Sequence, residues 1–175
     1  MLRRAFIFLA VLTGLSACEP TVSTEETVTA RFGTISSSMA KQIRLRQLDS
    51  VNALRAEKGL APLQMAASLN AAADTHGRDM AVQQRAWNFG SDGSSPQTRA
   101  QKAGFQGRVL GENVGESFQG DVSMLQVWLN DKYARPVMFD RDATHFGFGW
   151  YQQRSGKIWW VQLIGQAGGQ IVTSN

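Results

Sequence analysis

The stretch that decides the fold runs from Asn88 to Val114 and reads NFGSDGSSPQTRAQKAGFQGRVLGENV. It opens with a cluster of turn residues, Gly90 to Pro96, whose glycines allow positive φ and whose Ser and Asp side chains bond their own backbone. Ser95 followed by Pro96 predicts an N-cap with proline at the first helical position, so a short helix should begin here and end at Gly104. The stretch therefore predicts a turn, a short helix and then a strand.

The predicted strand, Val109 to Val114, places a carboxylate and an amide in an otherwise apolar run. A carboxylate in that position either accepts several hydrogen bonds or has a perturbed pKa. Glu112 is therefore a candidate to line a cavity. The sequence also allows a structural role, in which Glu112 accepts hydrogen bonds from nearby turn amides and organises the cavity wall.

Two helices are predicted before this stretch. Apolar residues recur at helical spacing from Ile43 to Leu54, and Gly59 closes that element. An alanine-rich helix follows from about Ala66 to Gln83, with His76 on its apolar face. A lone inward histidine is usually a hydrogen-bonded core residue, because a ligand or switch needs partners.

A helix and two strands are predicted after it. Asp121 can cap a helix whose apolar face includes Trp128. In the strand from His145 to Gln153, aromatic residues alternate with Gly147, Gly149 and Tyr151, so one face is aromatic and the other is nearly bare. A bare face lets a helix approach the backbone closely. The strand 158–164 is apolar on both sides, as expected of a central strand, so the whole pattern predicts an α+β fold.

These motifs resemble a bacterial member of the CAP superfamily, which comprises the cysteine-rich secretory proteins, antigen 5 and the plant pathogenesis-related class 1 proteins. The resemblance runs from about Leu48 to Gly165 and rests on four motifs. They are the GSDGSSP turn, the tripeptide Gly111-Glu112-Asn113, the run Arg78-Asp79-Met80-Ala81 and the Trp128 helix. The resemblance implies an α-β-α sandwich with a small antiparallel sheet between helices, which we expect to occupy residues 39–168.

The N-terminal segment is predicted to be a lipoprotein leader, residues 1–17. A positive start at Arg3-Arg4 precedes an apolar run too short to span a bilayer. The end, Leu15-Ser16-Ala17-Cys18, resembles a lipobox, in which Cys18 is acylated and becomes the mature N-terminus. Residues 18–38 read as a tether, whose second half has the alternative of docking through residues such as Ile35, and residues 169–175 read as a tail.

Charge and cysteine content exclude several classes of function. The chain has 18 basic and 14 acidic residues, and two of the basic ones lie in the predicted leader. With no basic-aromatic run or zinc-finger spacing, the sequence predicts no nucleic-acid partner. Cys18 is the only cysteine, so no intrachain disulfide can form.

The metal cavity of the CAP family is only half present. Many members hold a divalent metal with two histidines and two acidic residues. The resemblance aligns Glu112 with the first acid and Asp131 with the second, but Asn88 and Ala134 stand at the histidine positions. Two carboxylates without imidazoles are a poor zinc site, so we expect no metal cofactor. Weak binding of a hard divalent cation through oxygens is left open.

Three classes of function remain. The first is an extracytoplasmic binding module, anchored to the inner or outer membrane through Cys18 on the periplasmic side, with an unknown protein, glycan or lipid ligand. The second is an envelope hydrolase with Glu112 as general base and Asp131 or His145 as its partner. His145 has the alternative of being an exposed strand-edge residue. The third is a carrier of hydrophobic ligands that uses the aromatic residues of the last strands, which at strand spacing are more often core.

Overall fold

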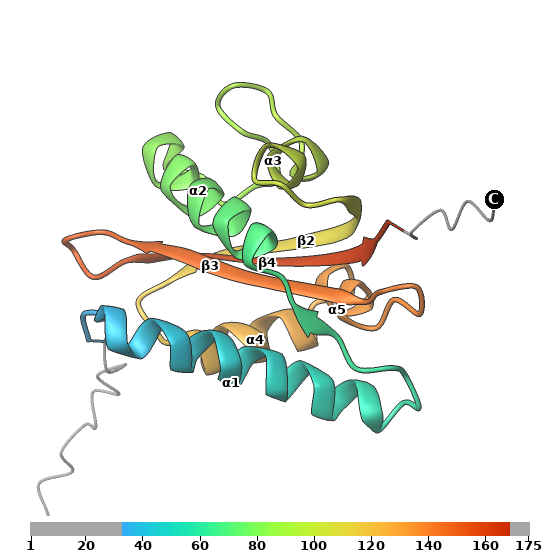
Figure 1. Ribbon diagram of the computed structural model, residues 1–175. Helices are drawn as coiled ribbons and strands as arrows, with labels where there is room; N and C mark the ends of the chain where they lie inside the picture. The colour runs from blue at the N-terminus through green and yellow to red at the C-terminus, as the bar shows by residue number, and fades with distance from the viewer. Residues whose placement is uncertain (1–32, 169–175) are drawn as a thin grey trace, which may run out of the picture.

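The computed structural model describes residues 33–168, which form one sheet between two layers of helices (Figure 1). The leader, Cys18, most of the predicted tether and the predicted tail lie outside the described residues. Within residues 33–168, no helix combines the length and the apolar character needed to cross a bilayer. The fold is the α+β sandwich that the sequence predicts.

The predicted helices and strands occur in the predicted order, together with a two-residue strand and a five-residue helix that were not predicted. They are α1 (Ser37–Ala56), β1 (Gln64–Met65), α2 (Ala67–Gln83), α3 (Pro96–Lys102), β2 (Gly107–Ser117), α4 (Asp121–Asn130), α5 (Ala134–Met138), β3 (His145–Gln152) and β4 (Ile158–Ala167). Ser95 caps α3 as predicted, because its side chain accepts a hydrogen bond from the amide of Thr98. Helix α1 begins inside the segment that was expected to be tether, and Ile35 packs against the core just before it.

The sheet has the strand order β1-β3-β4-β2. Strand β4 is central and pairs antiparallel with both β2 and β3. The expectation of an antiparallel sheet needs one correction, because the short strand β1 pairs parallel with β3 through Gln64 and Met65. The sequence shows no sign of β1, since two paired residues are too few to make an alternating pattern. Strand β2 is the outer strand at the other edge.

Helices cover both faces of the sheet. Figure 1 shows α2 and α3 on one face and α1, α4 and α5 on the other. The side chains of β4 divide between two hydrophobic clusters. Trp159, Val161 and Leu163 pack in the cluster that includes α2, whereas Ile158, Trp160 and Ile164 pack in the cluster that includes α1 and α4. This division confirms the prediction of a central strand covered on both sides.

The bare face of β3 receives α2. A Cβ atom built on Gly147 would lie 2.3 Å from Cβ of Leu69, and one on Gly149 would lie 2.5 Å from the amide nitrogen of Asp74. On the helix side, a Cβ on Gly77 would lie 3.0 Å from the backbone of Trp150. Glycines on both elements therefore set the close approach of α2, which carries His76 towards the site.

Two charged residues tie α1 to distant parts of the chain. Arg55 is buried, and its guanidinium donates to the carbonyls of Ala61, Met138 and Asp140 at 2.9, 2.8 and 2.9 Å. Asp121 was expected to cap α4, but Gly120 is the N-cap. The buried Asp121 carboxylate instead accepts from Arg46 of α1, so its oxygens are used between helices rather than within one.

Candidate functional site

The four residues predicted to line a cavity do so together. Asn88, Glu112, Asp131 and Ala134 all line a cavity of about 600 Å³ at the outer edge of β2. The remaining walls come from β2 and from α4 and α5. They are the residues from Asn113 to Ser117, with Gln119, Ser123, Met124, Val127, Trp128, Tyr133 and Val137. We call this cavity the β2 groove.

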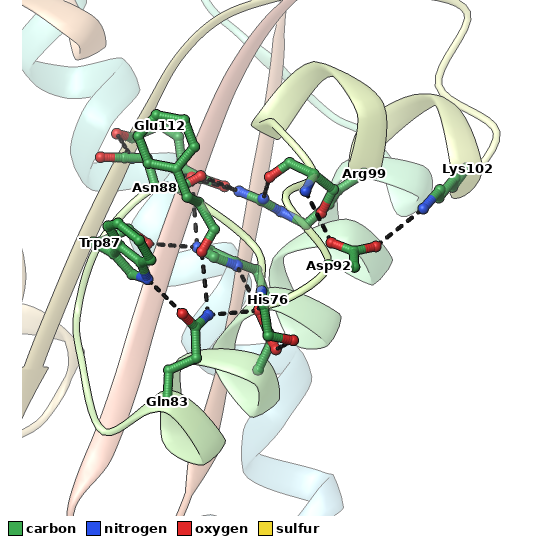
Figure 2. Close-up of polar contacts among 12 residues, drawn as sticks. His76, Gln83, Trp87, Asn88, Asp92, Arg99, Lys102 and Glu112 are labelled. Carbon is green, nitrogen blue, oxygen red and sulfur yellow. Dashed lines mark hydrogen bonds and ion pairs between the residues drawn. The ribbon is translucent and has the colours of Figure 1, made fainter.

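Glu112 is held by a guanidinium. Nη2 of Arg99 donates to Oε1 and Oε2 of Glu112 at 2.9 and 2.8 Å, and Nδ2 of Asn88 donates to Oε2 at 3.1 Å (Figure 2). The expectation that turn amides bind this carboxylate is therefore wrong, since the side chains of Arg99 and Asn88 donate its hydrogen bonds. Charge-assisted bonds of this type are about twice as strong as neutral ones, so Arg99 takes over the role expected of the turn.

The Glu112 carboxylate is closed off from solvent. Its side chain is 0% exposed, whereas the strand backbone around it lines the groove. Burial raises the pKa of Glu112, while the charge and hydrogen bonds of Arg99 and the bond from Asn88 act in the opposite direction. The carboxylate thus serves as a buried partner for Arg99 behind the wall of the groove.

His76 lies behind Glu112 and is also fully buried. Its Nε2 lies 2.8 Å from the carbonyl oxygen of Trp87 and 3.8 Å from Oε2 of Glu112 (Figure 2). Among the described residues, Nδ1 has no hydrogen-bond partner. Burial and the nearby charge of Arg99 lower the pKa of His76 to about 4, so the ring is neutral at pH 7. The hydrogen-bonded core histidine predicted from the sequence is confirmed.

Asp131 and Ala134 lie on the other side of the groove, at the start of α5. Oδ1 of Asp131 accepts from the amides of Tyr133 and Ala134 at 2.7 and 2.8 Å. The bonds from Ala134 and Tyr133 lower the pKa of Asp131 and keep it ionised. This carboxylate therefore stabilises the chain before α5, in the way an N-cap does.

His145 does not line the β2 groove. It stands at the first position of β3, where its Nδ1 lies 2.8 Å from Oγ1 of Thr144 and its ring packs against Phe105. The structure thus separates His145 from Glu112 and Asp131, the carboxylates with which it was considered as a catalytic partner.

The residues present do not fit the divalent metal of the family. Ala134 offers no donor, Asn88 directs its amide nitrogen at Glu112, and Arg99 contacts both Glu112 oxygens. Within residues 33–168, no three or more His, Cys, Asp or Glu residues are grouped so that they could hold a metal ion. A guanidinium already supplies the positive charge that a metal would bring to Glu112.

The family model for the cysteine-rich secretory proteins, CAP, matches residues 48–164. The chain belongs to the CAP family. The Bacillus subtilis protein YkwD is 26% identical over 151 residues, which cover 86% of this chain and 56% of YkwD. The CAP match confirms the family resemblance that the sequence motifs indicate.

Two solved structures show the same fold. An extracellular protein containing an SCP domain from Bacillus anthracis aligns at 23% identity with a TM-score of 0.61, covering 77% of this chain and 45% of that one. An outer surface protein from Borrelia burgdorferi aligns at 14% identity with a TM-score of 0.66, covering 79% of this chain and 100% of that one. This chain therefore spans about half the length of YkwD and of the Bacillus anthracis protein.

Sequence reasoning missed Arg99, the residue that organises the site. Its Nη1 donates to the carbonyl of Ser94 at 2.7 Å and its Nη2 to the carbonyl of Asn88 at 3.1 Å, so one guanidinium joins the turn to Glu112. A signal was present, because Arg99 precedes Ala100 in a short helix that must bury one face. An arginine there needs a buried anion, and Glu112 was the unpaired candidate.

Proposed function

We propose that this protein is a lipid-anchored protein of the cell envelope whose CAP domain binds a ligand in the β2 groove without catalysing a reaction. The observation that carries this proposal is the buried pair of Arg99 and Glu112. It removes the main acid-base candidate from the groove, while the groove itself stays open. An open cavity without reactive groups is suited to binding.

The hydrolase alternative loses support at each of its residues. A general base must come within hydrogen-bond reach of the proton that it abstracts. The Glu112 side chain is inaccessible and bound to Arg99, and Asp131 accepts two backbone amides. His145 lies outside the groove. Together these positions offer no acid-base pair facing a substrate there.

The carrier alternative is also weakened. Trp159 and Trp160 are fully buried core residues. They pack between the sheet and its helices and do not line a ligand pocket. The β2 groove is bordered by strand backbone and polar side chains as well as by apolar ones. A carrier of hydrophobic ligands would instead need an enclosed apolar pocket.

The anchor part of the proposal rests on the lipobox-like run Leu15-Ser16-Ala17-Cys18. Two acyl chains on one residue hold a protein stably at a membrane where one chain is marginal. An extracytoplasmic location agrees with the names of the two structural relatives, an extracellular protein and an outer surface protein. The tether would then place the groove in the envelope, within reach of proteins and glycans.

Photo-crosslinking in intact cells tests the proposal. A photoreactive phenylalanine analogue at Val127, which lines the groove, is compared with the same analogue at Val122 on the same helix, which does not. These side chains are 56% and 58% exposed, so the two probes meet solvent equally. We expect a specific adduct from position 127 only. Equal adducts from both positions, or none from position 127, would show that the groove is not the binding surface.

A further inference from the structure

The groove exposes the main chain of an edge strand. Nδ2 of Asn88 donates to the carbonyl of Glu112 at 3.0 Å, and Nε1 of Trp128 donates to the carbonyl of Val114 at 3.1 Å. Alternate residues of a strand direct their backbone groups to the same side. Glu112, Val114 and Glu116 therefore direct their amides and carbonyls away from β4, whereas Asn113 and the other alternate residues pair with it.

One half of this edge is sealed by side chains. Gln97 of α3 donates to the carbonyl of Gly107 at 3.0 Å and accepts from the amide of Val109 at 2.8 Å. In the other half, Asn88 and Trp128 cap the carbonyls of Glu112 and Val114, but no described residue caps the amides of Val114 and Glu116 or the carbonyl of Glu116. Proteins usually protect such edges against added strands. The exposed part coincides with the β2 groove.

The walls leave room for an added strand. Val127 and Tyr133, which line the groove on the helix side, are 56% and 76% exposed. The residues from Glu112 to Ser117 all line the groove, a length of on the order of 20 Å at about 3.4 Å per residue. A segment of about six extended residues would match that length.

The charge of the groove indicates what the segment carries. All the charged residues that line it are acidic, namely Glu112, Glu116 and Asp131, although the chain as a whole has a formal net charge of +4. Arg99 neutralises Glu112, and Nζ of Lys157 lies 2.7 Å from Oε2 of Glu116, which leaves Asp131 as the lining carboxylate without an ion-pair partner among the described residues. A ligand with a lysine or arginine would complement this carboxylate.

We infer that the β2 groove binds an extended polypeptide segment with a basic residue, which adds as a strand to the exposed edge at Val114 and Glu116. The inference rests on the proposed function and assigns its ligand class. Main-chain hydrogen bonds give affinity in this mode, and side-chain pockets give specificity. An acyl chain would leave these amides unpaired at a cost.

The first test selects peptides that bind the protein and then measures whether their binding depends on the exposed edge of β2. Phage that display random peptides of about twelve residues are enriched on the full chain in detergent, and the strongest peptides are synthesised for calorimetry. Glu116→Pro removes the outward amide and spares the bonds to β4, because proline is tolerated at an edge where its nitrogen faces away from the neighbouring strand. Glu116→Ala is the matched control, since it removes the same carboxylate and keeps the amide.

We expect basic peptides that bind the wild type, lose about tenfold or more in affinity with Glu116→Pro and lose at most about threefold with Glu116→Ala. A second pair keeps the test decisive if the proline variant does not fold. Val127→Arg places a positive charge in the groove and should weaken binding about tenfold, whereas Val122→Arg, equally exposed on α4 but outside the groove, should have no effect.

Strand addition is overturned if no peptide is enriched or if binding tolerates both Glu116→Pro and Val127→Arg. A concentration-dependent dimer that Glu116→Pro abolishes would also overturn the inference, because the added strand would then come from a second copy of this chain and not from a basic peptide. Crosslinking from Val127 together with any of these results would leave the binding module intact and reject only its peptide ligand. If position 127 gives no crosslink in cells but peptides bind to the groove in vitro, the groove has no ligand in the cell, and the proposed function fails although the peptide specificity holds. The two failures are therefore distinguishable.

Discussion

Nη2 of Arg99 lies within 2.9 Å of both carboxylate oxygens of Glu112, and both side chains are almost completely buried. The same guanidinium bonds the carbonyls of Ser94 and Asn88, so it holds the turn, α3 and β2 in one network (Figure 2). Among the described residues, its Nε has no hydrogen-bond partner. This network, rather than a metal, sets the geometry of the site.

Breaking the buried pair should destabilise the domain strongly. Arg99→Leu and Glu112→Leu should each lower the free energy of unfolding by about 3–5 kcal/mol, because each leaves an unpaired charge inside the protein. The double variant should lose much less than the sum of the two. Urea unfolding of the four proteins measures the coupling, and additive losses would contradict the ion pair.

The stability should fall on acidification because of His76. Its pKa is about 4 in the folded protein and 6.5 in the unfolded chain, so the unfolded state binds more protons between these values. The free energy of unfolding should decrease by about 2–3 kcal/mol as the pH falls from about 7 to about 4. The raised pKa of Glu112 acts in the opposite direction over the acidic part of this range.

His76→Gln isolates the histidine, because it can keep a hydrogen bond to Trp87 and does not titrate. Denaturant unfolding at several pH values should show a shallower acid loss in His76→Gln than in the wild type. Parallel curves for the two proteins would mean that His76 is not the titrating group.

Zinc should not stabilise the wild-type protein. A metal present at a hundred times its dissociation constant would add about 2.7 kcal/mol, which thermal unfolding resolves. Asn88→His with Ala134→His should create a weak zinc shift, since Arg99 still competes for Glu112. Adding Arg99→Ala to that double variant should increase the shift, and adding Glu112→Ala should remove it. A large shift in the wild type that Glu112→Ala abolishes would contradict this account of the site.

The contact between α2 and β3 should not accept a side chain. Gly149→Ala should lower the free energy of unfolding by about 1–3 kcal/mol or more, because its Cβ would lie 2.5 Å from the amide nitrogen of Asp74. Gly33→Ala is the control, since a Cβ there meets nothing within 4 Å. Calorimetry of both variants should show a lower melting temperature only for Gly149→Ala.

Cys18 should carry the membrane anchor. Wild-type protein should fractionate with membranes and have a mass that includes acyl chains, because acyl burial contributes about 0.8 kcal/mol per methylene. Cys18→Ala should lack this mass and be either uncleaved or released. A wild-type protein that fractionates as soluble, without lipid mass, would refute the lipoprotein hypothesis.

The sequence predicted most of the fold because its signals are local. The Ser95-Pro96 cap, the alternation of aromatic residues and glycines in β3 and the apolar run of β4 each specify an element within a few residues. Strand β1 was not predicted, because its two residues form a strand only when β3 pairs with them. Helix α4 was expected near Asp121, but the carboxylate of Asp121 does not cap it, because Arg46 of α1, 75 positions away, binds that carboxylate.

Four residues of the groove could be named from the sequence, but neither Arg99 nor the bonds of each carboxylate could. The four residues Asn88, Glu112, Asp131 and Ala134 do line one cavity. What each carboxylate bonds could not be read from sequence, because Arg99 reaches Glu112 only after the turn folds α3 onto β2. The exposed edge of β2 is likewise a property of the strand order, which no local pattern encodes.

Strand β4, which lies between β2 and β3 in the sheet, is also the last strand along the described residues. Both β2 and β3 pair with it, and Trp159 and Trp160 enter the two cores from its opposite faces. Until the ribosome has made this segment, the earlier helices have no complete surface on which to pack, and contacts so distant in sequence form slowly. For the exported protein proposed above, such a chain would stay open to a translocation channel during synthesis, and it would complete its fold only after β4 has followed the earlier elements across the membrane.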